Sequence, residues 1–216
     1  MNINETFKRI ISSIILLPIV IFSIIKGSYF FNSLIFLCFL ISSYEWLKMN
    51  NKFFYKIFGI FFLIVSFYLI FKLRNEFDNQ YFYLLFITFI CVSTDIGGYI
   101  FGRYFKGPKL TKISPKKTYS GVVGSFLLSL FSAYIFFKFS PVQTLLSFKI
   151  EIFIFVLLIS SISQIGDIIV SYFKRKSKIK DTGNIIPGHG GILDRIDGML
   201  FAFPSSYLIL INWNFI

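Results

Sequence analysis

The residues best suited to chemistry lie in one short stretch, residues 171–197, which reads SYFKRKSKIKDTGNIIPGHGGILDRID. Its glycines free backbone N–H groups to approach a phosphate closely, as anion-binding loops do. Its lysines and arginines supply countercharge, and Asp194 and Asp197 offer oxygen ligands for a cation. Backbone donors, basic side chains and metal-binding carboxylates are the groups that phosphoryl or nucleotidyl transfer requires.

Two further carboxylates fall inside apolar runs, where an ionisable residue is costly and is a functional candidate by default. Asp95 precedes Arg103 by eight residues and Asp167 precedes Lys174 by seven, which places them about 12 Å and about 10 Å from the basic ends of their helices. With Asp194 and Asp197, four carboxylates are therefore expected near one level of the membrane.

Carboxylates gathered at one level repel one another unless a cation or a proton lies between them. The chain has one histidine and two cysteines, Cys38 and Cys91, which lie in apolar runs without a metal-type partner nearby. The available ligands are therefore oxygen atoms, which suit Mg²⁺ and not zinc. Structural ion pairs with lysine or arginine remain an alternative, above all for Asp95.

The helices that carry Asp95 and Asp167 each present a polar face. Along residues 150–173, the polar side chains recur at the spacing of one helical face, as Ser160, Gln164, Asp167 and Ser171. Along residues 80–102, Thr88, Cys91, Asp95, Gly98 and Gly102 form a face of small and polar residues. Asp95 and Asp167 therefore each lie on the polar face of their helix, and the spacing of Gly98 and Gly102 allows another helix to approach closely.

The composition requires a membrane, because 56% of the residues are hydrophobic and the mean hydropathy is +0.74. About 20 apolar residues cross a bilayer as a helix. The fold expected is an all-α, polytopic transmembrane bundle with about seven spans, at 10–26, 28–46, 54–72, 80–102, 119–139, 150–173 and 195–213. It forms one integral membrane unit, with N-terminal spans in residues 1–80 and a catalytic transmembrane region in residues 81–216.

The distribution of basic residues predicts a cytoplasmic N-terminus. With that orientation, fifteen lysines and arginines lie in cytoplasmic segments and five outside. The two richest loops, 103–118 and 174–194, then share the cytoplasmic face. A net charge of +12 would suggest nucleic acid in a soluble protein, but here the charge lies between apolar spans, so no nucleic-acid partner is expected.

The stretch 171–197 resembles the signature of the phosphatidate cytidylyltransferase family. The matching residues are Ser171, Lys174, Arg175, Lys180, Asp181, Pro187, Gly188, His189, Gly190, Gly191, Asp194, Arg195 and Asp197. The segment Gln164–Asp167 and a block that runs from Asp95 through Gly102, Arg103 and Ser114–Thr118 to Gly121 are also similar. The resemblance covers residues 90–200.

The resemblance implies an enzyme of phospholipid biosynthesis that condenses CTP with phosphatidic acid to give CDP-diacylglycerol and pyrophosphate. The catalytic residues expected are Asp167, Asp194, Asp197, Lys174, Arg175 and Arg195. The substrate-binding residues expected are Ser114, Lys116, Lys117, Thr118, Lys180, His189, Gly190 and Gly191. One or two Mg²⁺-type cations are expected on Asp167, Asp194 and Asp197, with Asp95 a weaker candidate, and an additional monovalent cation is left open.

The resemblance implies that the protein lies in the bacterial inner membrane, with its active site on the cytoplasmic side. One departure from its pattern is Tyr119-Ser120, which stands where Trp-Glu is usual, and Gly198 stands where serine is common. An inactive scaffold and a transporter with carboxylates in its membrane spans are the alternatives. The sequence leaves open a homodimer, the acyl-chain preference and the choice between CTP and dCTP.

Overall fold

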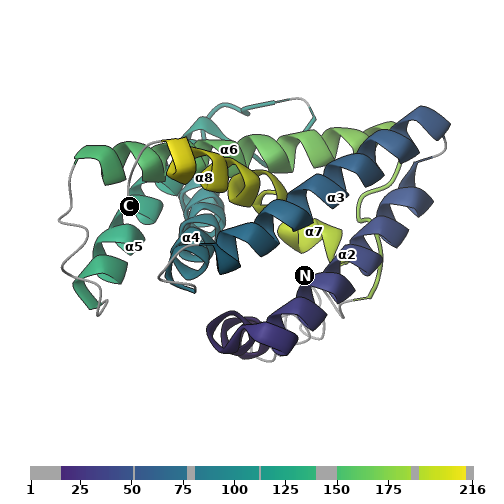
Figure 1. Cartoon of the computed structure of the whole chain (residues 1–216). Helices are drawn as coiled ribbons and strands as arrows, with labels where there is room; N and C mark the ends of the chain where they lie inside the picture. The colour runs from purple at the N-terminus through teal and green to yellow at the C-terminus, as the bar shows by residue number, and fades with distance from the viewer. Residues whose placement is uncertain are drawn as a thin grey trace.

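The computed structural model describes residues 16–50, 52–76, 81–111, 113–139, 150–185 and 190–212, and these are helical with short connections (Figure 1). The labelled helices are α2 (Ser28–Met49), α3 (Phe53–Asn75), α4 (Phe82–Phe105), α5 (Tyr119–Phe139), α6 (Ile150–Lys176), α7 (Leu193–Ile196) and α8 (Met199–Asn212). A further short helix covers Leu16–Lys26. Within the described ranges no strand forms, which agrees with the all-α expectation.

Five helices, α2 to α6, are long and apolar enough to cross a membrane, so the chain is an integral membrane protein. The first and last of the seven expected spans differ. Residues 10–15 lie outside the described residues, and Leu16–Lys26 is short. The expected span 195–213 divides into α7 and the 14-residue α8, which is only about 21 Å long against about 30 Å of hydrocarbon.

Gly27 separates the first two helices by adopting a φ of 65°, in the left-handed region that favours glycine. Arg74, buried at the end of α3, closes this turn. Its Nε donates to the carbonyl of Ile24 at 2.9 Å, so the guanidinium satisfies an unpaired carbonyl at the end of the short helix. A Cβ on Gly27 would lie 2.4 Å from Arg74 Nη2, which explains the absence of a side chain there.

Helices α4 and α5 pack through glycines on both partners. A Cβ on Gly97 would lie 2.4 Å from the carbonyl oxygen of Gly124, and one on Gly121 would lie 2.9 Å from that of Gly98. Small residues at these positions let the two backbones approach closely, as in many membrane helix pairs. The close approach fixes the loop between α4 and α5 relative to Asp95.

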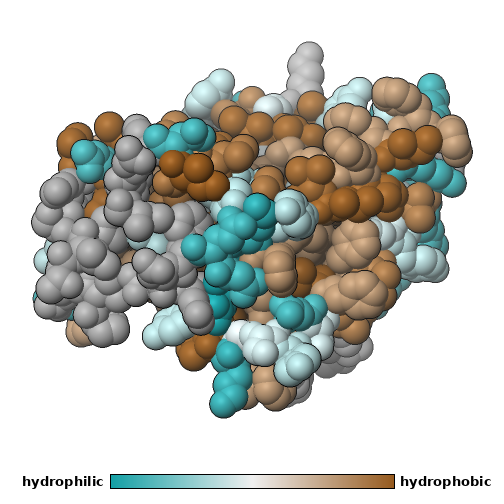
Figure 2. Space-filling view, viewed as in Figure 1, coloured by the Kyte–Doolittle hydropathy of each residue, from teal (hydrophilic) through white to brown (hydrophobic). Residues whose placement is uncertain are grey.

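The remaining helices surround a core of aliphatic and aromatic side chains. In Figure 1, α8 runs beside α6 and α3, and it contacts both of them and α4. Many large apolar side chains nevertheless point outward, including Phe36, Phe61 and Phe131, and brown hydrophobic atoms cover much of the face in Figure 2. An apolar exterior of this kind is what a helix bundle presents to lipid.

Hydrogen bonds between distant helices define two ends of the bundle. At one end, Lys176 of α6 donates to the hydroxyl of Tyr55 in α3, at 2.6 Å. The loops after α2, α4 and α6 all lie at this end. At the other end, Tyr207 of α8 donates to Glu76 after α3. The segments that carry the candidate site residues are thus gathered at a single end.

Candidate functional site

Lys174 lies at the centre of the site, near the end of α6. Its Nζ contacts Asp194 Oδ1 at 2.9 Å and Asp197 Oδ2 at 3.4 Å. All three side chains are almost completely withdrawn from solvent, with exposed fractions of 9%, 4% and 12%. A buried ammonium group with two carboxylates makes charge-assisted hydrogen bonds that hold α6 to α7 and to the start of α8.

Asp194 uses its second oxygen to organise the loop that precedes α7. Oδ2 accepts hydrogen bonds from the N–H of Thr182 at 2.8 Å, the hydroxyl of Thr182 at 3.1 Å and the N–H of Gly191 at 3.0 Å. Burial disfavours the charged form, but Lys174 and these N–H donors outweigh it and hold the pKa of Asp194 below its ordinary value. Asp194 is therefore an ionised group with both oxygens engaged by the protein.

Lys117 brings the loop between α4 and α5 to the same place. Its Nζ lies 2.6 Å from Asp167 Oδ2 and donates to the backbone carbonyl of Gln164 at 3.1 Å. Ser171, one turn further along α6, donates to Asp167 Oδ1 at 3.3 Å. The exposed fractions of Lys117 and Asp167 are 23% and 31%, so this pair remains accessible from outside the protein.

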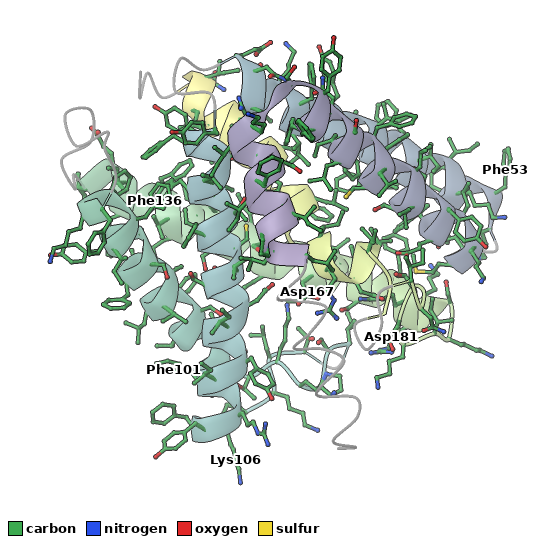
Figure 3. The ribbon with its side chains drawn as sticks, turned by 90° about the horizontal axis from the view of Figure 1, so that it is seen from below. Phe53, Phe101, Lys106, Phe136, Asp167 and Asp181 are labelled. Carbon is green, nitrogen blue, oxygen red and sulfur yellow. The ribbon has the colours of Figure 1, made fainter. Side chains whose placement is uncertain are left out.

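Asp95 and Arg195 join these groups. Asp95 interacts electrostatically with Asp167, Lys117 and Arg195, and Asp197 interacts with Asp167, Lys174 and Asp95. Asp95, Asp167 and Asp197 thus interact with one another, and Asp194 is joined to them through Lys174, although the four carboxylates come from α4, α6 and the segment around α7. Figure 3 labels Asp167 below the yellow turns of the ribbon, with Phe136 far from it.

Helices α4 and α6 are hydrogen-bonded beside this cluster, at the residue before Asp95, while Gly98 and Gly102 of the predicted face of α4 pack against α5. Thr94, which precedes Asp95, donates to Ser160 at 2.8 Å, and Gln164 Nε2 lies 3.5 Å from the same hydroxyl. Ser125 of α5 donates to the carbonyl of Thr94 at 2.7 Å. These bonds tie three helices together where Asp95 enters the site.

The loop between α4 and α5 is stabilised by its own hydroxyl groups. Thr118 Oγ1 accepts from the N–H of Gly121 at 3.1 Å and caps the start of α5. Ser120 hydrogen-bonds Thr118 and donates to the carbonyl of Lys106, while Tyr119 is exposed. Ser120 therefore closes the loop and carries no charge. Ser114 contributes its carbonyl to the N–H of Lys117.

The other expected site residues are four basic side chains and the residues of the glycine-rich segment. Lys116, Lys180, Arg175 and Arg195 are exposed, and Arg175 donates to the carbonyl of Ile179 at the end of α6. Gly190 has a φ of 85°, and a Cβ on it would lie 2.8 Å from Asp194 Oδ2, so a glycine is required there. His189, with Pro187 and Gly188, lies outside the described residues.

Sequence reasoning missed Glu45, which lies in α2 and is 1% exposed. Its carboxylate accepts hydrogen bonds from Thr182 and from the N–H groups of Ile192 and Leu193. The signal was present, because Glu45 is the only acidic residue in the apolar run 28–46. An ionisable side chain in such a run needs a partner or a function.

The donor set of the cluster consists of carboxylate oxygens, which suits a hard cation such as Mg²⁺. Among the described residues, no three His, Cys, Asp or Glu side chains are grouped closely enough to hold a metal ion. Two of the carboxylates instead face Lys174, and Asp167 faces Lys117. The residues thus fit a cation by their chemistry, while lysine ammonium groups lie beside the carboxylates in this arrangement.

Comparison with known proteins agrees with these features. Residues 51–212 match the model of the cytidylyltransferase family. The chain is 35% identical over 214 residues to a phosphatidate cytidylyltransferase of Rickettsia felis, covering 96% of this chain and 93% of the relative. It is also 35% identical over 185 residues to that of Staphylococcus saprophyticus (83% and 69% covered) and 37% identical over 147 residues to that of Bacillus subtilis (68% and 54%).

Proposed function

The chain belongs to the cytidylyltransferase family, and from that premise we propose that the cluster of Asp95, Asp167, Lys174, Asp194 and Asp197 is its catalytic centre. The reaction condenses CTP with phosphatidic acid to give CDP-diacylglycerol and pyrophosphate, a step of phospholipid biosynthesis. The observation that carries the proposal is the buried contact of Lys174 with Asp194 and Asp197, next to the accessible pair of Lys117 and Asp167.

The chemistry places a phosphate oxygen of phosphatidic acid in line with the α-phosphorus of CTP. A new P–O bond forms, the bond to the β-phosphate breaks, and pyrophosphate leaves with the electron pair. Because the attacking oxygen is already anionic, no strong base is needed. The main obstacle is the repulsion between two polyanions, which positioning and positive charge reduce.

The basic side chains bind the phosphates of the substrates. Lys117 is accessible, and Arg195 is exposed beside Asp95, so both are placed to contact substrate phosphates. Lys174 is buried and holds Asp194 and Asp197 in position. Lys116, Lys180 and Arg175 add positive charge around the entrance, and His189 with Gly190 and Gly191 belongs to the phosphate-binding loop.

Divalent cations of the Mg²⁺ type, one or two in number, fit the same cluster. Asp167 and Asp197 would hold the cation with Asp95 beside them, and Asp194 would contribute while it orders the loop. A bound cation would supply charge neutralisation for the triphosphate and the leaving pyrophosphate. The protein groups position these charges and exclude water from the reacting phosphates.

The protein resides in the bacterial inner membrane with the site on the cytoplasmic side. The basis is the concentration of lysines and arginines at the end of the bundle that carries the site. This orientation gives the site access to cytoplasmic CTP and to lipid of the inner leaflet. Whether two copies associate as a homodimer does not enter the mechanism, because all the groups named lie in one chain.

The experiment combines purified protein, radiolabelled CTP, phosphatidic acid and Mg²⁺, and measures label in extracted lipid. Labelled CDP-diacylglycerol is expected with Mg²⁺ and none after chelation with EDTA, with activity restored by added Mg²⁺. Turnover without any divalent cation would exclude the cation site, and failure to form labelled lipid at all would favour an inactive scaffold.

A further inference from the structure

Glu45 connects the N-terminal half of the bundle to the loop of the catalytic centre. From α2, its Oε1 accepts a hydrogen bond from the N–H of Ile192 at 3.0 Å, and its Oε2 accepts from the N–H of Leu193 at 2.8 Å. Oε2 also accepts from the hydroxyl of Thr182 at 2.9 Å. All the contacting partners donate, which matches a carboxylate, an acceptor without a hydrogen of its own.

The surroundings of Glu45 are built around its carboxylate. A Cβ on Gly191 would lie 2.4 Å from Oε2, and one on Gly183 would lie 2.8 Å from Oε1. Two glycines thus let the loop wrap closely around the carboxylate. With an exposed fraction of 1%, Glu45 has no access to solvent, so these donors replace its hydration.

The contacts of Glu45 lead directly to the catalytic carboxylates. Ile192 and Leu193 immediately precede Asp194, and the hydroxyl of Thr182 lies 2.9 Å from Glu45 Oε2 and 3.1 Å from Asp194 Oδ2. That hydroxyl has one proton and serves one carboxylate at a time, so it links the two groups. Glu45 also lies before residues 51–212, the part of the chain that matches the family model.

We propose that Glu45 is a positioning residue of the transfer reaction: its carboxylate anchors the loop at Thr182 and the first turn of α7, and so sets Asp194 and Asp197 against Lys174. The inference depends on the proposed catalytic centre. Glu45 touches no reacting atom. It acts through α7, because a displaced first turn would move both aspartates away from the ammonium group of α6.

The test compares Glu45→Ala and Glu45→Gln with the wild type, as full-length protein in vesicles that contain phosphatidic acid. Alanine removes every acceptor and should lower kcat about 100-fold, the loss that a displacement of about 1 Å can cause. The KM for CTP should rise by a smaller factor than kcat falls, because Lys116 and Lys117 lie in the loop between α4 and α5, outside the segment that Glu45 anchors. Glutamine keeps one oxygen acceptor, so it should fold and lower kcat only about tenfold.

Hydrogen exchange distinguishes positioning from a general loss of stability. Exchange of the amides of Thr182, Ile192 and Leu193 should accelerate in Glu45→Ala, while α4 and α5 stay as protected as in the wild type. Ser42→Ala is the matched control. This serine lies one turn earlier on α2, is fully buried and has no hydrogen-bond partner within the described residues, so kcat and exchange should not change.

Two results that involve kcat would overturn the proposal. One is a kcat for both Glu45 variants within about twofold of the wild type, which corresponds to only about 0.4 kcal/mol of barrier. The other is exchange that rises equally in all helices while kcat per folded molecule is unchanged. If the wild type formed no lipid product, the proposed function would fail, whereas unchanged exchange of the amides of Thr182, Ile192 and Leu193 in Glu45→Ala would contradict the anchor alone.

Discussion

Lys174 is a buried cation that depends on two carboxylate partners. Its side chain is 9% exposed and lies between two carboxylates, so the removal of one partner leaves a buried charge incompletely paired. Breaking a buried pair in this way costs about 3–5 kcal/mol in other proteins. The same contacts that fold the loop therefore also hold the proposed catalytic groups in place.

Asp194→Asn should abolish CDP-diacylglycerol formation and leave the protein inserted in the membrane. The amide keeps the shape of the side chain, but it lacks the charge that pairs with Lys174, and its NH₂ group cannot accept a hydrogen bond. Activity of the purified variant should fall by more than about 100-fold. Glu151→Gln, an exposed acid at the start of α6, is the control and should keep full activity. Near-normal turnover by Asp194→Asn would refute its role.

Lys117→Ala should mainly raise the KM for substrate, with a smaller change in kcat. Lys117 is accessible and reaches the site from a loop, so its charge serves binding of the incoming phosphates more than the order of the core. A lost charge-assisted hydrogen bond of about 1.5–3 kcal/mol corresponds to a rise in KM of about 10- to 100-fold. Steady-state kinetics would measure it, with the exposed Lys109→Ala as the control. An unchanged KM for both CTP and phosphatidic acid would exclude Lys117 from binding.

At the level of helices, the pair α4 and α5 places two parts of the site. Asp95 lies on α4, and Thr118 caps the start of α5 directly after Lys117. The glycines between the two helices set the distance between these parts. The spacing of Gly98 and Gly102 predicted a close helix contact, and the structure confirms it.

Gly97→Ala should destabilise the bundle, because the added Cβ would lie 2.4 Å from the carbonyl oxygen of Gly124 and the helices would have to separate. Overpacking of this kind costs about 1–3 kcal/mol. Thermal unfolding in detergent micelles should show a lower Tm than the wild type. Val123→Ala, which changes a lipid-facing side chain of α5 with an exposed fraction of 56%, should unfold near the wild-type temperature. An equal Tm for Gly97→Ala and the wild type would mean that α4 and α5 are not closely packed at Gly97.

In the whole molecule, five long helices alternate in direction and bring three loops to one end. That end contains the ion pairs of Lys117 and Lys174, while Arg74 and Glu76 mark the opposite end. The arrangement lets a water-soluble substrate and a lipid substrate meet, because CTP arrives from water and phosphatidic acid from the lipid beside the helices.

In a chain whose Cys38 and Cys91 have been replaced by alanine, Lys109→Cys and Lys178→Cys are introduced one at a time. Each new cysteine should react with a membrane-impermeant thiol reagent from the cytoplasmic side only. Both positions are exposed in loops at the site end of the bundle. A cysteine at Asn75 should react from the opposite side, since α3 ends there. Labelling of Lys109 and Lys178 from different sides would contradict a single site end.

The sequence determined the chemistry and the family, because both depend on local patterns. Apolar runs of about 20 residues are needed wherever a helix crosses lipid, and an aspartate in such a run is conspicuous. The glycine, lysine and aspartate residues of 171–197 follow each other closely enough to be read together. These patterns predicted seven spans, of which five are helices long enough to cross a membrane, and they predicted the approach of Asp95, Asp167 and Asp197.

Tertiary structure alone decided which charges pair and how the ends of the bundle close. Hydropathy does not indicate which helix lies beside which, so the contact of Glu45 with Leu193, across 148 residues, could not be read from spacing. The same holds for Lys117 with Asp167 and for the division of the last expected span at Asp197 and Gly198. Local composition shows that a charged side chain in an apolar segment needs a partner. Only the packing of the helices decides which residue that partner is.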